Sequence, residues 1–151
     1  MKYLVFILFA CLASCKAQKN DELLLGESDD NMFLVAHDAY SNITEQETSV
    51  IKDAKSLKRF YSKINKTRKP GLPVPEIDFT KNMLLLVCLG EQKEKKPLSI
   101  KRTEDNGKIL ITIGLSKINE ASQNTSMISY PFYIYKIPNT SKTVIFQNSG
   151  R

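Results

Sequence analysis

One apolar run indicates how the rest of this chain is arranged: Asn82-Met83-Leu84-Leu85-Leu86-Val87-Cys88-Leu89-Gly90. Its residues are almost all apolar, and the run ends at a glycine. A continuous apolar strand of this kind is typical of the centre of a sheet that is covered on both faces. We therefore expect a central strand over residues 82–89, with other segments packed on each side of it.

Further strands are expected on either side of this one. A hairpin follows, because Asp105-Asn106-Gly107 is a strong turn signal between two alternating segments. In its return strand, Ile109, Ile111, Ile113 and Leu115 fall on one face. Pro131 places the long segment that contains it at a sheet edge or a bulge. The expected strands are 32–37, 49–52, 98–103, 108–116, 126–137 and 143–146.

One helix is expected between the second strand and the central strand. Asp53 is a suitable N-cap, and Leu57, Phe60, Tyr61 and Ile64 follow at helical spacing. This apolar stripe should pack on a sheet. The prolines of residues 67–76 exclude a helix there. The sequence predicts an α+β fold, a small and mostly antiparallel sheet or sandwich with one amphipathic helix packed on it.

The N-terminus has the pattern of a secretory signal: Met1-Lys2, an apolar run over residues 3–13, then small residues. The run is shorter than the ~20 residues of a spanning helix. Leu12-Ala13-Ser14-Cys15 resembles a bacterial lipobox, in which the cysteine carries the lipid. Several acyl chains on Cys15 would hold the protein on a bilayer stably. We expect a lipoprotein signal at 1–14, a lipid-anchored tether at 15–30 and one domain at 31–151.

Charge and cysteine content narrow the class of protein. The net charge is +6, and +5 remains without Lys2. Basic residues gather at 63–69 and 93–96, either as a solvated rim or as a surface that attracts anionic envelope or an acidic partner. No aromatic-basic motif indicates nucleic acid. After loss of Cys11 and lipidation of Cys15, Cys88 has no disulfide partner, and its apolar context favours a buried thiol.

No set of residues indicates catalysis, a metal or a cofactor. His37 is the only histidine, so neither a His-rich metal site nor a triad with a second imidazole can form. Asp78 precedes the central strand, where a turn hydrogen bond is its expected role. Gly is sparse, and no phosphate-binding loop is present. We therefore expect a protein without enzymatic activity.

Residues 75–138 resemble a known family. The segment Pro75-Glu76-Ile77-Asp78-Phe79-Thr80-Lys81-Asn82-Met83, the strand that ends at Gly90, the hairpin, Tyr130-Pro131-Phe132 and Ile137-Pro138 are similar to the PrcB-type C-terminal domain. That family is named for a lipoprotein-like subunit that associates with a surface protease and stabilises it. The family usually has Gly-Gly-Tyr after the strand-ending glycine. Residues 91–98 replace that element here, so a contact made there would differ.

Three functions remain open. The first is a non-enzymatic envelope lipoprotein that binds a protein, such as a protease, with Tyr130, Phe132, Tyr133 and Tyr135 as the expected contact rings. The second is a small-molecule or glycan-binding envelope module, or a protease inhibitor. The third is an unrecognised hydrolase that uses Cys88. Because Lys rather than Asp follows Cys15, the outer membrane is favoured over the inner membrane.

Overall fold

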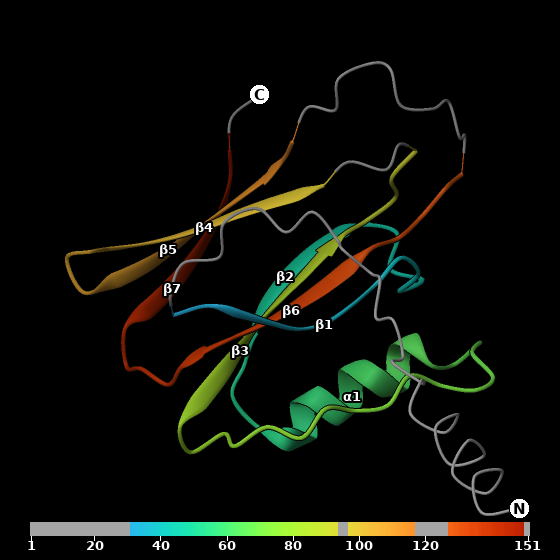
Figure 1. Ribbon diagram of the computed structural model, residues 1–151, viewed down its shortest axis with the longest axis horizontal. Coiled ribbons are helices and arrows are strands. Elements are labelled where there is room, and N and C mark those ends of the chain that lie inside the picture. The colour runs from blue at the N-terminus through green and yellow to red at the C-terminus, as the bar shows by residue number, and fades with distance from the viewer. Residues whose placement is uncertain (1–30, 94–96, 117–126, 150–151) are drawn as a thin grey trace, which may run out of the picture.

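The computed structural model describes residues 31–93, 97–116 and 127–149, which form three layers (Figure 1). A four-stranded sheet lies between the helix and a three-stranded sheet. This is an α+β fold with two small, mostly antiparallel sheets, as the sequence predicted. In chain order the elements are β1 (Phe33–Asp38), β2 (Gln46–Ile51), α1 (Ala54–Ile64), β3 (Asn82–Leu89), β4 (Leu98–Asp105), β5 (Lys108–Leu115), β6 (Phe132–Pro138) and β7 (Thr143–Asn148).

The middle sheet has the order β1-β6-β3-β2, with every neighbouring pair antiparallel. Because successive side chains of a strand point to opposite faces, β3 contributes to two separate cores. Met83, Leu85, Val87 and Leu89 pack toward the second sheet. Leu84, Leu86 and Cys88 pack toward α1. The prediction of a central strand covered on both faces is confirmed.

Helix α1 covers one face of this sheet. The carboxylate of Asp53 accepts a hydrogen bond from the backbone N–H of Ser56 at 2.8 Å, which confirms it as the N-cap. The predicted stripe is buried: Leu57, Phe60, Tyr61 and Ile64. The ring of Phe60 meets Phe132 of β6 edge-on, with 5.3 Å between centroids. The chain between α1 and β3 has no helix, as its prolines predicted, and returns along the same face.

The second sheet has the order β4-β5-β7. Its hairpin turns at Asn106 and Gly107, which both have positive φ, the backbone that a two-residue turn of this kind requires. Ile109, Ile111 and Ile113 are buried against the middle sheet as predicted. Leu115 is 40% exposed. Strand β7 runs parallel to β5, and the pairs between them that the structure describes end at Ile113 and Asn148, short of Leu115.

Two expectations about strands are corrected. Strand β6 begins at Phe132 and lies between β1 and β3, so it is a central strand, whereas Pro131 indicated a sheet edge or a bulge. Pro131 comes just before the ladder, where its missing N–H removes no hydrogen bond between strands. Strand β2 begins at Gln46 rather than at Ser49, because its polar first half pairs with the end of β3 at a sheet edge. The expected loop 117–125 lies outside the described residues.

Candidate functional site

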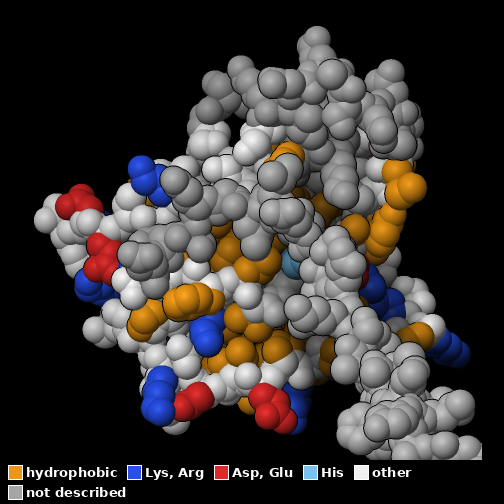
Figure 2. Space-filling model, viewed as in Figure 1, with side chains coloured by type: hydrophobic (Ala, Val, Ile, Leu, Met, Phe, Trp, Pro, Cys, Tyr) orange, Lys and Arg blue, Asp and Glu red, His pale blue; other side chains and the backbone are white. Residues whose placement is uncertain are grey.

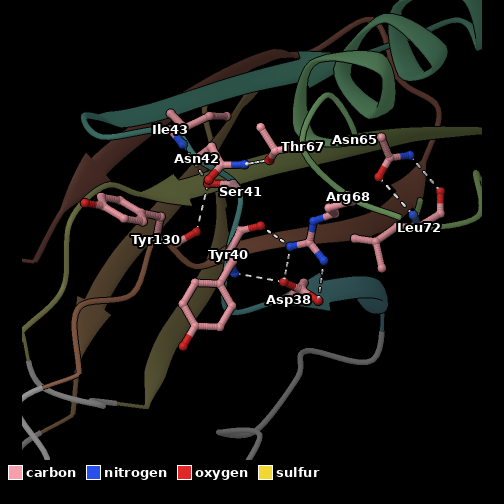
Figure 3. A network of polar contacts seen from close by, with 10 residues as sticks. All are labelled: Asp38, Tyr40, Ser41, Asn42, Ile43, Asn65, Thr67, Arg68, Leu72 and Tyr130. Atoms are coloured by element: carbon pink, nitrogen blue, oxygen red, sulfur yellow. Dashed lines mark hydrogen bonds and ion pairs between the residues drawn. The ribbon is translucent and has the colours of Figure 1, made fainter. Parts of the chain in front are cut away.

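Three segments meet at one end of the middle sheet: residues 39–45 after β1, residues 65–72 after α1, and residues 129–131 before β6 (Figure 3). Their meeting point is an ion pair. Arg68 lies 2.5 Å from Asp38 between Nη2 and Oδ1 and 3.3 Å between Nη1 and Oδ2. Such a two-pronged contact fixes both position and orientation. Arg68 also donates to the carbonyl of Tyr40, so one guanidinium holds both ends of the turn.

The environment of Asp38 keeps its carboxylate ionised. Partial burial would by itself raise the pKa, but the hydrogen bonds from Arg68 and from the N–H of Tyr40, with the charge of Arg68, outweigh that effect. The pKa of Asp38 therefore lies below its usual value. The side chains of Arg68 and Asp38 are only 20% and 25% exposed. This pair is better shielded from solvent than the pair of Lys63 with Glu47, which is about half exposed.

The loop after α1 is shaped so that Arg68 reaches Asp38. Asn65, the C-cap of α1, uses its side-chain amide to bond both the N–H and the carbonyl of Leu72, at 2.8 and 2.9 Å. These two bonds close the loop on itself. Asn42, in the left-handed region with φ 58°, donates to the hydroxyl of Thr67 at 2.9 Å. Figure 3 shows these bonds on either side of Arg68.

The segment before β6 is held by backbone hydrogen bonds. The N–H of Tyr130 donates to Ala39 at 2.8 Å, and the N–H and hydroxyl of Ser41 both donate to the carbonyl of Tyr130 at 2.8 Å. Ser41 is buried. On the other side, Ser129 and Gln92 exchange two backbone bonds of 2.8 and 2.9 Å. The chain at Tyr130 is thus clamped between two neighbours.

This clamp presents a group of apolar side chains on the surface. Hydrophobic side chains reach the surface at several places (Figure 2). Tyr40, Met127 and Ile128 are 43%, 64% and 49% exposed. The hydroxyl of Tyr40 donates to the sulfur of Met127 at 3.0 Å, and Tyr40 forms a backbone bridge with the half-buried Tyr130. We call Tyr40, Met127, Ile128 and Tyr130 the Tyr40 patch.

The four rings predicted to contact a partner lie in different environments. Phe132 and Tyr135 are buried, one in the core under α1 and the other between the sheets. They are interior packing residues, because β6 is central and both of its faces are covered. Tyr133 is half buried and stacks on His37, with 6.1 Å between ring centroids. Tyr130 belongs to the Tyr40 patch. The predicted lipidation residue, Cys15, and the tether at 15–30 lie outside the described residues.

The remaining candidates have structural roles. Cys88 is fully buried, and burial, with the negative charge of Glu47, raises the pKa of its thiol to about 12. It therefore stays protonated at neutral pH and lacks the thiolate that attacks a substrate. The carboxylate of Asp78 accepts from the N–H of Thr80 at 3.0 Å, the predicted turn bond. Within the described residues, no group of three His, Cys, Asp or Glu side chains could hold a metal ion.

An open depression lies between β2, at the edge of the middle sheet, and strands β5 and β7 of the second sheet. It is lined by Gln46 and Thr48 of β2 and by Ile113, Phe146, Gln147 and Asn148 of the second sheet. The amides of Gln46 and Asn148 bond each other across it, at 2.8 and 3.3 Å. Paired amides can recognise polar ligands, so this is a second place where binding chemistry is available.

Comparisons with known proteins do not assign this chain to a family. A scan against models of protein families finds no match, and searches of curated proteins and of solved structures find none either. Among the described residues, no helix is long and apolar enough to cross a membrane. Sequence reasoning named Tyr130 but missed Tyr40 and Arg68. No local pattern marks them, because Arg68 meets Asp38 across 30 residues of chain.

Proposed function

We propose that this protein is a non-enzymatic lipoprotein of the bacterial cell envelope, anchored through Cys15, whose α+β domain binds another protein. The observation that supports the binding role is the Tyr40 patch, an exposed apolar group on a hydrogen-bonded frame. Exposed apolar groups of this kind mark interaction sites. Tyr, with its large contact area, is a frequent binding hot spot.

The resemblance to the PrcB-type domain bears on the border of this patch. The segment that departs from the family pattern begins at Glu91, and it adjoins the patch. Gln92 pairs with Ser129, and the hydroxyl of Tyr130 lies 3.4 Å from the carboxylate of Glu91. Because this segment borders the patch, its different sequence alters the contact surface. The partner would therefore differ in detail from the partner of the family. A protease remains the partner class that the resemblance favours, and the outer membrane the favoured location.

The test is a crosslinked pull-down from intact envelope with the full chain. The patch variant carries Tyr40→Ser and Met127→Ser. A matched control carries Val74→Ser and Ile145→Ser, which remove two other exposed apolar side chains, 40% and 38% exposed. We expect one dominant protein with the wild type and the control, and at least a tenfold loss with the patch variant. Equal recovery by both variants would refute the placement of the site.

The anchor is tested in the same experiment by Cys15→Ala. If the chain is lipid-anchored, this variant leaves the membrane fraction, and recovery of the partner falls with it. A protease among the recovered proteins would support the resemblance to the PrcB-type domain. If nothing is recovered from well-solubilised envelope with any variant, the protein-binding proposal fails.

A second candidate function is the binding of a small polar ligand or glycan in the depression between β2 and β7. The paired amides of Gln46 and Asn148 favour it. Screening of envelope glycans by shift in melting temperature, with Gln46→Leu as the non-binding control, tests this candidate. A ligand that raises the melting temperature of the wild type but not of Gln46→Leu would support it.

A further inference from the structure

Helix α1 carries a second stripe opposite the buried one. Lys55, Lys58, Arg59 and Ser62 repeat the spacing of Leu57, Phe60, Tyr61 and Ile64, displaced to the outer face, and all four are exposed. Lys52 and Lys66, also exposed, flank the helix at its two ends. The helix itself contains no acidic residue. We call Lys55, Lys58 and Arg59 the basic helix face.

The charges of this face are only partly balanced within the domain, where Arg59 acts electrostatically on the N-cap carboxylate of Asp53. Among the described residues, the basic helix face makes no ion pair, whereas nearby Lys63 and Arg68 each have a carboxylate partner. On the helix surface, Lys55 is a neighbour of both Lys58 and Arg59, and these like charges repel each other. Lys55 also lies in the first turn, where the helix dipole favours anions. The placement of these charges therefore gives the helix little electrostatic stabilisation.

The chain enters the domain at the end of the sheet where this helix begins. Phe33 pairs with Lys136, Lys136 with Leu84, and Leu84 with Ile51, so the four residues form one row across the sheet. Ile51 lies just before the N-cap of α1, about 15 Å from Phe33 at three strand spacings. Residues 16–30 separate Cys15 from the described chain, and a segment of that length spans at most about 50 Å.

We propose that the basic helix face binds an anionic lipid bilayer and sets the orientation of the domain on the membrane. This inference rests on the lipid anchor of the proposed function, which keeps the domain within reach of a bilayer. The face has no aromatic or apolar side chain, and clustered lysines and arginines are the residues that an anionic lipid surface attracts. With α1 on the membrane, the Tyr40 patch near its C-terminal end remains a separate surface.

The experiment measures binding to vesicles of phosphatidylcholine with and without phosphatidylglycerol. It uses the full chain with Cys15→Ala, so that no lipid is attached and every variant shares the same N-terminal segment. The test variant carries Lys55→Gln, Lys58→Gln and Arg59→Gln, since Gln preserves helix propensity. The matched control carries Lys93→Gln, Lys101→Gln and Lys108→Gln, three exposed lysines without an ion pair among the described residues.

Each basic residue near an anionic surface contributes a factor of roughly five to binding. We expect the helix variant to lose at least tenfold, and up to about a hundredfold, of the preference for anionic vesicles, while the control stays within about threefold of wild type. Equal losses would show that net charge alone acts, and no loss would show that α1 does not bind; both overturn the proposal. Binding of polyglutamate without binding of vesicles would overturn it in favour of an acidic protein.

These outcomes are independent of the protein-partner test. The vesicles contain no protein, and the basic helix face shares no residue with the Tyr40 patch. Circular dichroism and melting temperature of both triple variants confirm that each is folded before binding is compared.

Discussion

Both terminal nitrogens of Arg68 donate hydrogen bonds to the carboxylate of Asp38, and this ion pair joins the loop after α1 to the end of β1. These two residues lie far apart in the chain but determine how the Tyr40 patch is presented. The same guanidinium bonds the carbonyl of Tyr40, so the ion pair and the patch belong to one structural unit.

Loss of this ion pair should destabilise the domain. Because both side chains are largely shielded, we expect Arg68→Ala to lower the free energy of unfolding by about 2 kcal/mol. Lys63→Ala breaks the more exposed pair with Glu47 and should cost less than about 1 kcal/mol. Urea unfolding of both variants is the measurement. Equal and small losses would mean that the Asp38 pair does not brace the loops.

The ion pair also predicts a dependence on pH. The pKa of Asp38 is lower in the folded state than the value of about 3.9 expected in the unfolded chain. Its contribution is therefore fully present well above that value and is lost as the pH falls through the folded pKa. The stability gap between wild type and Asp38→Asn should be wide at pH 7 and narrow below about pH 4. Urea titrations at pH 7 and pH 3 compare the two, and a gap that stays constant contradicts this.

Two glycines with positive φ differ in how closely the rest of the chain approaches them. Gly90 and Gly107 have φ of 71° and 77°. A Cβ on Gly90 would lie 2.8 Å from the carbonyl oxygen of Thr44, whereas one on Gly107 meets nothing within 4 Å. We expect Gly107→Ala to cost about 1 kcal/mol and Gly90→Ala about 3 kcal/mol. Thermal and urea unfolding measure both. Similar costs would show that the chain at residues 44–46 moves aside.

Burial of Cys88 predicts a protected thiol. In a full chain with Cys11→Ala and Cys15→Ala, a thiol reagent at pH 8 should label Cys88 at least about a hundredfold more slowly in the folded protein than in urea. Cys88→Ser, which buries a hydroxyl, should lower stability by about 2 kcal/mol. Rapid labelling of the folded protein would contradict the burial and revive Cys88 as a candidate nucleophile.

The aromatic residues of β6 and of the Tyr40 patch should respond differently to truncation. Phe132 is 1% exposed and packs on Phe60, so Phe132→Ala should cost about 4 kcal/mol. Tyr40 is 43% exposed, and Tyr40→Ala should change stability by less than about 1 kcal/mol. Calorimetric melting of the two variants gives the comparison. A stable Phe132→Ala variant would mean that this ring is not part of the core.

Local patterns predicted the elements that short-range chemistry decides. The apolar run at 82–89 indicated a strand covered on both faces, and β3 indeed contributes to two cores. Asp53 and the stripe from Leu57 to Ile64 indicated α1 with its cap and its buried face. Asn106 and Gly107 indicated the hairpin turn. Each of these depends on residues within a few positions of each other.

The candidate site could be predicted only in part. Tyr130 was named from the sequence, but with Phe132 and Tyr135, which the structure buries. The position of β6 within the sheet was not predicted, since Pro131 is compatible with a central strand when it lies just before the first pair. Tyr40 and Arg68 carry no local signal, because their importance comes from contacts that cross the fold.

Local sequence patterns were sufficient to predict the α+β class, the two-faced strand, the capped helix and the hairpin, because periodicity, capping and turn preferences act over a few residues. The folded chain adds three arrangements that no local pattern predicts: β7 runs parallel to β5, β6 lies between β1 and β3, and Arg68 meets Asp38. These arrangements follow from how the two cores and the loop ends pack together. That packing is a property of the whole chain, since each contact depends on elements that are distant in sequence.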